Sequence, residues 1–254
     1  MPFLVAMPRL SVDLSYLRLV SSFYVATFAI RVSFGISVIT FSHYVQASDF
    51  VYGLVVASSP LLEIVTIVWV GMAIDKYGRR RFLLSGLAIG LVGLYLLATT
   101  RETLPLAVLN AIHGISAGLI LVSSLALLTD YASPETRGRE MGVFDFVNLF
   151  GWIAGIVLGL VFLDVFRNDL AMTFLVSGTI ALVGFLYAYA NVREPQRDRF
   201  VSTSSGWRMF RQALSDRRIA FLLAPWFAVY VLISSAISFL PRALGGGTPT
   251  AAVA

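Results

Sequence analysis

The sequence predicts an all-helical bundle that spans a membrane seven times. Of its 254 residues, 58% are hydrophobic and only 13% are charged, and the mean hydropathy is +0.84. Soluble domains average about 45–50% apolar and about 25% charged residues. The apolar residues gather in seven long runs, and a helix needs roughly 20 such residues to cross a bilayer. These observations exclude a soluble domain and make the lipid bilayer the first expected partner.

Short polar segments separate the seven runs. The runs cover 16–45, 51–74, 82–100, 104–130, 139–163, 170–191 and 219–240. Thr103 and Pro105 supply start signals for the fourth run, and Ser133-Pro134-Glu135 precedes the fifth. The longest polar segment, 192–218, is expected to hold a short amphipathic helix on the membrane surface. The last residues, 241–254, are expected to form a disordered tail.

The basic residues indicate an orientation. If the N-terminus lies inside the cell, 15 of the 19 Lys and Arg residues fall in cytoplasmic segments, three lie outside and Arg31 lies within a span. Such an asymmetry is typical of the positive-inside rule. We therefore expect a cytoplasmic N-terminus in the plasma membrane. Topology then accounts for the basic pI of about 9.7, and no nucleic-acid partner is expected.

The residue types that most often carry cofactors and metals are scarce. The chain has no cysteine, and its two histidines, His43 and His113, are far apart, so neither a disulfide nor a metal cluster is expected. No cofactor is expected apart from a coupled proton or ion. The only lysine, Lys76, lies between two runs, which excludes a retinal Schiff base inside the membrane. No paired acids converge within the runs, and we do not expect an enzyme.

The densest polar cluster lies between the second and third runs. It reads Gly71-Met-Ala-Ile-Asp75-Lys-Tyr-Gly78-Arg79-Arg-Arg. Asp75 is expected at the C-terminal end of a helix, where the helix dipole disfavours a negative charge. The neighbouring arginines or a facing helix N-terminus must therefore offset this charge. That need indicates a hinge or latch more than a solvated loop.

This cluster resembles the loop between helices two and three of the major facilitator superfamily of secondary transporters. The family pattern is G-x-x-x-D-[R/K]-x-G-R-[R/K]-[R/K], and every defined position is filled in this chain. The residues that fill it are Gly71, Asp75, Lys76, Gly78, Arg79, Arg80 and Arg81. Asp130 and the segment from Pro134 to Gly142 are similar to the family's connection between helices four and five. The resemblance covers 16–195, and the seventh run by position only.

The resemblance implies a fold and a function. It implies a six-helix transporter half with a 3+3 inverted repeat at 1–191, a linker at 192–218 and one further span at 219–240. Its implied activity is secondary active transport of a small organic solute by alternating access, with efflux as one direction. It also implies a cytoplasmic gate, in which Arg79 links back to Asp130. The gate residues are Gly71, Asp75, Lys76, Gly78, Arg79, Arg80, Arg81, Asp130 and Arg137.

The chain departs from the family pattern in two helices. Asn110 stands four residues before Gly114, where the family often carries an arginine associated with proton coupling. In the fifth run Gly151, Gly155 and Gly159 repeat every four residues, as in the family's antiporter motif. The proline and the last glycine of that motif are replaced here by Ile156 and Leu160. We favour close helix packing over gating as the role of this glycine stripe.

Four polar residues within the runs are candidates for a substrate cavity. Arg31 and Glu63 lie at the centres of the first and second runs, and Asn110 and His113 share a face of the fourth. Intramembrane ionisable residues are costly and commonly functional. Two interpretations stay open for the charged pair. In the first, Arg31 and Glu63 neutralise each other. In the second, Arg31 anchors an anionic substrate or Glu63 takes up and releases a proton. His113 either satisfies a local hydrogen bond or contacts the solute.

The number of spans is smaller than the resemblance requires. Family members normally have twelve spans in two six-helix halves, with the substrate site between the halves. A truncated reading frame is the favoured explanation for seven. Two alternatives remain: a half-transporter that pairs with itself or with a second polypeptide, and a degenerate product or membrane scaffold without transport. A missing C-terminal half or a second subunit is therefore an expected partner, beside the small-molecule substrate.

Overall fold

The computed structural model describes residues 14–45 and 47–195, together with eight isolated residues between 215 and 239. Six helices fill the continuous ranges. They are α1 (Leu14–Tyr44), α2 (Asp49–Tyr77), α3 (Arg79–Leu97), α4 (Thr103–Tyr131), α5 (Arg137–Val165) and α6 (Leu170–Asn191). Each contains a segment long and apolar enough to cross a membrane. The prediction of an all-helical membrane bundle is confirmed for these six spans. The expected surface helix, the seventh span and the tail lie outside the continuously described residues.

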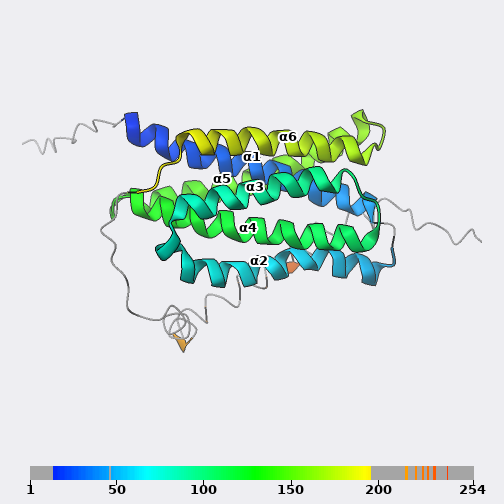
Figure 1. Ribbon diagram of the computed structural model, residues 1–254, viewed down its shortest axis with the longest axis horizontal. Helices are drawn as coiled ribbons and strands as arrows, with labels where there is room; N and C mark the ends of the chain where they lie inside the picture. The colour runs from blue at the N-terminus through cyan, green and yellow to red at the C-terminus, as the bar shows by residue number, and fades with distance from the viewer. Residues whose placement is uncertain are drawn as a thin grey trace, which may run out of the picture.

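The six helices run side by side along the longest axis of the molecule (Figure 1). α1 packs against α5 and α6, α4 packs against α2 and α3, and α3 also contacts α6. Exchanging the first three helices with the last three maps the α1–α5 contact onto α4–α2, and the α1–α6 contact onto α4–α3. This is the contact pattern that a 3+3 repeat gives. Because each span reverses the chain, α4 runs antiparallel to α1.

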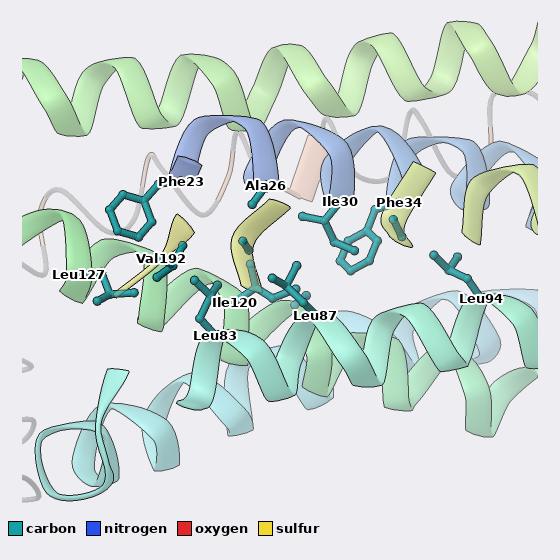
Figure 2. Packing of buried hydrophobic residues seen from close by; sticks show 13 residues of the cluster. Phe23, Ala26, Ile30, Phe34, Leu83, Leu87, Leu94, Ile120, Leu127 and Val192 are labelled. Carbon is teal, nitrogen blue, oxygen red and sulfur yellow. The ribbon is translucent and has the colours of Figure 1, made fainter. Parts of the chain in front are cut away.

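The main apolar core lies where α1, α3, α4 and α6 meet. Figure 2 shows Phe23, Ile30 and Phe34 of α1 facing Leu83 and Leu87 of α3, with Ile120 and Leu127 of α4 and Val192 closing the cluster. α1 and α4 are the most enclosed helices, whereas α2 and α5 are the most exposed. The two central helices thus carry the core, and α2 and α5 form its outer faces.

Two helix crossings depend on glycine. At the α1–α5 crossing, a Cβ atom on Gly155 would collide with the Val32 carbonyl and would lie 2.9 Å from the Cα of Gly35. At the α2–α4 crossing, a Cβ atom on Gly114 would collide with the Ser59 carbonyl. The two crossings correspond under the exchange of the two helix triplets. Glycine therefore allows close backbone approach in both of these helix pairs.

Candidate functional site

The charged cluster between α2 and α3 lies at a tight junction between the two helices. α2 ends at Tyr77 and α3 begins at Arg79, so Gly78 is the only residue between them. Gly78 has φ 94° and ψ 142°, which favours glycine because of the positive φ. Its ψ is extended, so Gly78 does not form a left-handed helix cap. The arginines expected in a loop instead form the first turn of α3.

Arg79 joins three helices at this end of the bundle, which we call the motif end. Arg79 itself is only 7% exposed. One guanidinium nitrogen lies 2.7 Å from Asp130 at the end of α4, and the other lies 3.0 Å from Asp75 in the last turn of α2. The Asp75 side chain is still 58% exposed. The pairing of Arg79 with Asp130 is the one that the family resemblance implies.

A carboxylate from beyond α6 completes the motif end. The two Glu194 oxygens accept hydrogen bonds from the backbone N–H groups of Arg79 (2.8 Å) and Arg80 (2.7 Å). These N–H groups open α3 and have no partner within the helix, and a negative charge is favourable there. In return the Arg80 guanidinium donates to the carbonyls of Tyr189 (3.0 Å) and Val192 (2.7 Å). The start of α3 and the end of α6 thus cap each other.

The remaining residues of the expected gate make weaker contacts than Arg79. Gly71 is exposed and has nothing within 4 Å of a built Cβ atom. The Lys76 ammonium lies 5.2 Å from the centre of the Tyr77 ring, and Arg81 is exposed. Arg137 donates to the Thr129 carbonyl at 3.3 Å, near the C-terminus of α4. The strongest interactions of the expected gate are therefore the ion pairs of Arg79 with Asp75 and Asp130.

A second buried carboxylate at this end was not anticipated. Glu140, in the first turn of α5, is 5% exposed and accepts a 2.6 Å hydrogen bond from the Tyr24 hydroxyl on α1. Arg139 contacts its other oxygen at 2.9 Å. An acid at a helix N-terminus is the signal that could have identified it. The bond ties α5 to α1, as Arg79 ties α3 to α2 and α4.

Of the expected cavity residues, Asn110 holds α2 at a helix break. Pro60 interrupts α2, and it leaves the Val56 carbonyl without its helical donor. The Asn110 amide donates to the Val55 carbonyl at 2.8 Å and to the Val56 carbonyl at 3.4 Å, and it lies 3.3 Å from the Ser58 hydroxyl. The structure therefore places the Asn110 amide between α4 and α2, where its contact with the Val56 carbonyl stands in for the one helical bond that the proline removes.

Arg31, Glu63 and His113 lie around the middle of the bundle. No carboxylate among the described residues lies within ion-pair distance of the Arg31 guanidinium, so Arg31 and Glu63 do not form a direct pair. The guanidinium lies 5.8 Å from the centre of the Phe34 ring, and that ring lies 3.6 Å from the imidazole of His113. His113 is 7% exposed, and its Nδ1 atom has no hydrogen-bond partner in the described part of the chain.

The glycine stripe of α5 lies against α1. Built Cβ atoms on Gly151 and Gly159 would lie within 3.1 Å of Arg31 Cβ and of Ile36 Cα respectively. Gly142 is exposed and has nothing within 4 Å of a built Cβ atom. The stripe therefore serves close packing in this structure, as at the Gly155 crossing.

Two bacterial resistance proteins are similar to this chain in sequence. The chain is 23% identical to the quinolone resistance protein NorA of Staphylococcus aureus (strain MRSA252) over a match of 215 residues that covers 77% of this chain and 54% of NorA. It is 34% identical to multidrug resistance protein 3 of Bacillus subtilis (strain 168) over 94 residues, which are 37% of this chain and 18% of that relative.

Solved transporters share the fold. A bacterial homolog of the human lysosomal transporter Spinster, in an inward-facing and unoccupied conformation, superposes with a TM-score of 0.68 at 16% identity, covering 91% of this chain and 55% of that one. The human organic anion transporter MFSD10 (TETRAN) gives 0.60 at 19% identity, covering 70% and 48%. This chain thus spans about half the length of both transporters.

A family model matches most of the sequence. It covers residues 19–253 and describes the Major Facilitator Superfamily. The motif that meets at Arg79, the six membrane-length helices and the repeated helix contacts agree with this match. The chain is a multi-pass membrane protein that belongs to the Major Facilitator Superfamily of transporters.

Proposed function

We propose that this chain forms one half of a secondary transporter that moves a small organic solute across the plasma membrane by alternating access. Family membership supports membrane transport, and the resistance proteins among its relatives favour export. The relatives named above include drug resistance proteins and an organic anion transporter, so their names do not select one solute. The chain spans about half of NorA and of both solved transporters, which supports a requirement for a second half.

The single observation that carries the proposal is the ionic junction at Arg79. It joins α2, α3 and α4 through one buried guanidinium, and the Glu194 carboxylate adds the end of α6. A junction of this kind holds several helices of one half together as a rigid group. Asp75 presents a largely exposed carboxylate at the edge of this group. In the proposal, this carboxylate meets helix N-termini of the second half when that side of the transporter is closed.

The outer faces of the bundle supply a surface for the second half. α2 exposes large apolar side chains near its middle, and α5 does so along most of its length. On α2 they are Leu61, Ile64, Val65 and Trp69, and on α5 they are Phe146, Leu149, Phe150, Ile153 and Val157. These two helices are equivalent under the repeat, so a second six-helix half would meet a symmetric pair of walls. The solute path then runs between the halves.

The experiment measures transport with a panel of labelled organic anions, cations and neutral solutes. Cells express the chain together with the coding sequence that follows it in the genome. At least one solute is expected to be transported. Asp75→Asn is expected to lower the transport rate by about tenfold, which corresponds to an activation free energy about 1.4 kcal/mol higher. Glu102→Gln is the matched control, because Glu102 is exposed and makes no side-chain cap bond at the start of α4.

The two parts of the proposal fail separately. If the wild-type assembly moves no solute of the panel, transport is the wrong function and a membrane scaffold becomes the better description. If solutes move and Asp75→Asn leaves the rate unchanged, transport stands and the gate role of Asp75 is wrong.

A further inference from the structure

Arg31 is an intramembrane cation on the accessible face of α1. Most of α1 between Ser21 and Phe41 is buried, but Val25 and Phe28 are exposed and Arg31 is partly exposed on the same face. A guanidinium at the depth of the bilayer is costly when it faces lipid, and such residues face the bundle interior or a water-filled cavity. This face of α1 therefore borders a polar space or another protein segment. No described carboxylate lies within ion-pair distance of Arg31, although the Glu63 carboxyl of α2 is close enough to feel its charge.

A wall of aromatic rings stands beside this cation. The Phe28 ring stacks on Phe150 of α5 at a centroid distance of 6.1 Å, and Phe150 stacks on Phe146 at 5.8 Å with an interplanar angle of 5°. Their exposed fractions are 37%, 53% and 66% for Phe28, Phe150 and Phe146. Large rings exposed in a row provide flat contact area for another ring.

Gly151 places the cation and the aromatic wall at the same spot. A Cβ atom built on Gly151 would lie 3.1 Å from the Cβ of Arg31 and 3.2 Å from the Phe28 ring. Gly151 follows Phe150 directly in α5. The Cβ of Arg31 and the Phe28 ring therefore both border Gly151, one turn of α5 before the tightest α1–α5 approach at Gly155.

Polar groups without partners lie near this surface. Phe34 lies 5.8 Å from the Arg31 guanidinium and contacts His113, whose Nδ1 atom is buried and lacks a partner among the described residues. The Oδ1 atom of Asn148, one turn before Gly151 on α5, is also buried and lacks a hydrogen-bond partner among the described residues. Unsatisfied buried polar atoms are uncommon in native proteins and call for a bound water or ligand. The His113 ring contacts Phe34 beside the cation, and Asn148 lies one turn from Gly151, so both support a site for a molecule between α1, α4 and α5.

We propose that this surface binds an aromatic organic anion, with its carboxylate or sulfonate on Arg31 and its ring against Phe28 and Phe150. The guanidinium fork matches a carboxylate in a bidentate fashion, and the aromatic wall supplies the apolar contact. A cationic solute of the same shape is repelled by Arg31. The inference rests on the proposed transport function and names the class of solute that the chain would carry.

The test uses the purified full-length chain in nanodiscs and three probes of similar shape. These are 2-naphthoate, 2-naphthylmethylamine and 2-naphthalenemethanol, with binding followed by the shift in thermal unfolding and by probe fluorescence. Naphthoate is expected to bind most tightly. Arg31→Gln is expected to raise its Kd by about tenfold or more, because a charge-assisted bond is lost, and Arg31→Lys is expected to restore part of the affinity. Arg101→Gln, an exposed loop change, is the matched charge control.

A second variant pair covers the case in which Arg31→Gln does not fold. Phe150→Ala removes a ring of the wall, while Leu160→Ala removes an exposed side chain of α5 away from it. Phe150→Ala is expected to weaken naphthoate binding several-fold, since stacking contributes about 0.5–1.5 kcal/mol beyond burial, and Leu160→Ala is expected to leave it unchanged. Equal effects of the two variants would show that the solute ring does not contact the aromatic wall.

The remaining outcomes separate the inference from the proposed function. Tighter binding of the amine than of naphthoate, or an unchanged Kd in a folded Arg31→Gln protein, overturns the anion class even if the assembly transports other solutes. If an assembly that transports no solute still binds naphthoate through Arg31, the binding site is supported and only the proposed transport function is contradicted. Nanodiscs with and without phosphatidylglycerol distinguish the sources of the anion. If this lipid abolishes naphthoate binding while stabilising the protein through Arg31, the site belongs to a lipid headgroup and the inference is overturned.

Discussion

At the residue scale, Glu194 shows how a side chain outside the recognised motif can organise it. Removing its carboxylate by Glu194→Ala leaves the first N–H groups of α3 without acceptors. We expect a loss of about 1 kcal/mol in the free energy of unfolding, the usual effect of removing a helix cap. The measurement is thermal or denaturant unfolding of the purified protein in detergent.

Glu102→Ala is the matched control for this change. Glu102 stands at the N-cap position of α4, is exposed, and makes no side-chain hydrogen bond to the helix. It tests the effect of removing an exposed acid near a helix start without removing a cap bond. Equal destabilisation by both substitutions would show that charge near the helix end, and not the two bonds to α3, is what Glu194 contributes.

The sequence supported the pairing of Arg79 with Asp130 through the resemblance, but it did not reveal Glu194 or Glu140. Glu194 lies 115 residues after Arg79, the residue whose N–H it accepts, and no local pattern joins positions so far apart. Glu140 carried a usable sign, an acid in a first helical turn, but its partner Tyr24 is 116 residues away. Local motifs predict local geometry, whereas these carboxylates are placed by helix packing.

At the scale of the elements, the break in α2 is supported from a neighbouring helix. The amide of Asn110 donates to carbonyls around Pro60. We expect Asn110→Ala to lower the free energy of unfolding by about 1–3 kcal/mol, because buried carbonyls lose a donor. The loss is expected to shrink in a Pro60→Ala background, where residue 60 regains an N–H for the Val56 carbonyl. Unfolding of the four proteins in this cycle measures the coupling, and strictly additive effects would contradict it.

The α1–α5 crossing gives a second prediction for the elements. Gly155→Ala introduces a Cβ atom into the Val32 carbonyl, and overpacking of this kind costs about 1–3 kcal/mol. The matched control is Gly142→Ala in the same helix, where a Cβ atom meets nothing within 4 Å. Thermal unfolding is expected to be earlier for Gly155→Ala alone. A wild-type unfolding temperature for both variants would show that the two helices can separate without penalty.

The hydrophobic runs predicted the six described helices correctly, but they predicted the helix ends less accurately. The third run was expected to start at residue 82, yet α3 begins at Arg79, since the Glu194 carboxylate and the Asp130 pair accommodate arginines in its first turn. The glycine spacing in the fifth run indicated a packing stripe, and the structure gives it α1 as its partner. Apolar periodicity identifies a span, but it does not say which helix a face will meet.

At the scale of the whole molecule, the orientation in the membrane is a prediction from the basic residues alone. The chain has no cysteine, so single cysteines report position cleanly. Thr99→Cys lies between α3 and α4, and Glu135→Cys lies between α4 and α5, both at exposed positions. We expect a membrane-impermeant maleimide to label Thr99→Cys in intact cells and Glu135→Cys only after the membrane is opened. The reverse pattern would place the N-terminus outside.

The pairing of helices across the repeat has a consequence for the order of events during synthesis. α1 finds its main neighbours in α5 and α6, and α2 finds its main neighbour in α4, so the first three helices to leave the ribosome have few native contacts with one another. The nascent chain must hold α1, with its intramembrane arginine, in an unfinished environment until more than one hundred further residues have been inserted. Chains stopped after α4 are therefore expected to remain open to proteases and quality-control factors. Completion of α6 is the step at which this half of the protein becomes a folded body.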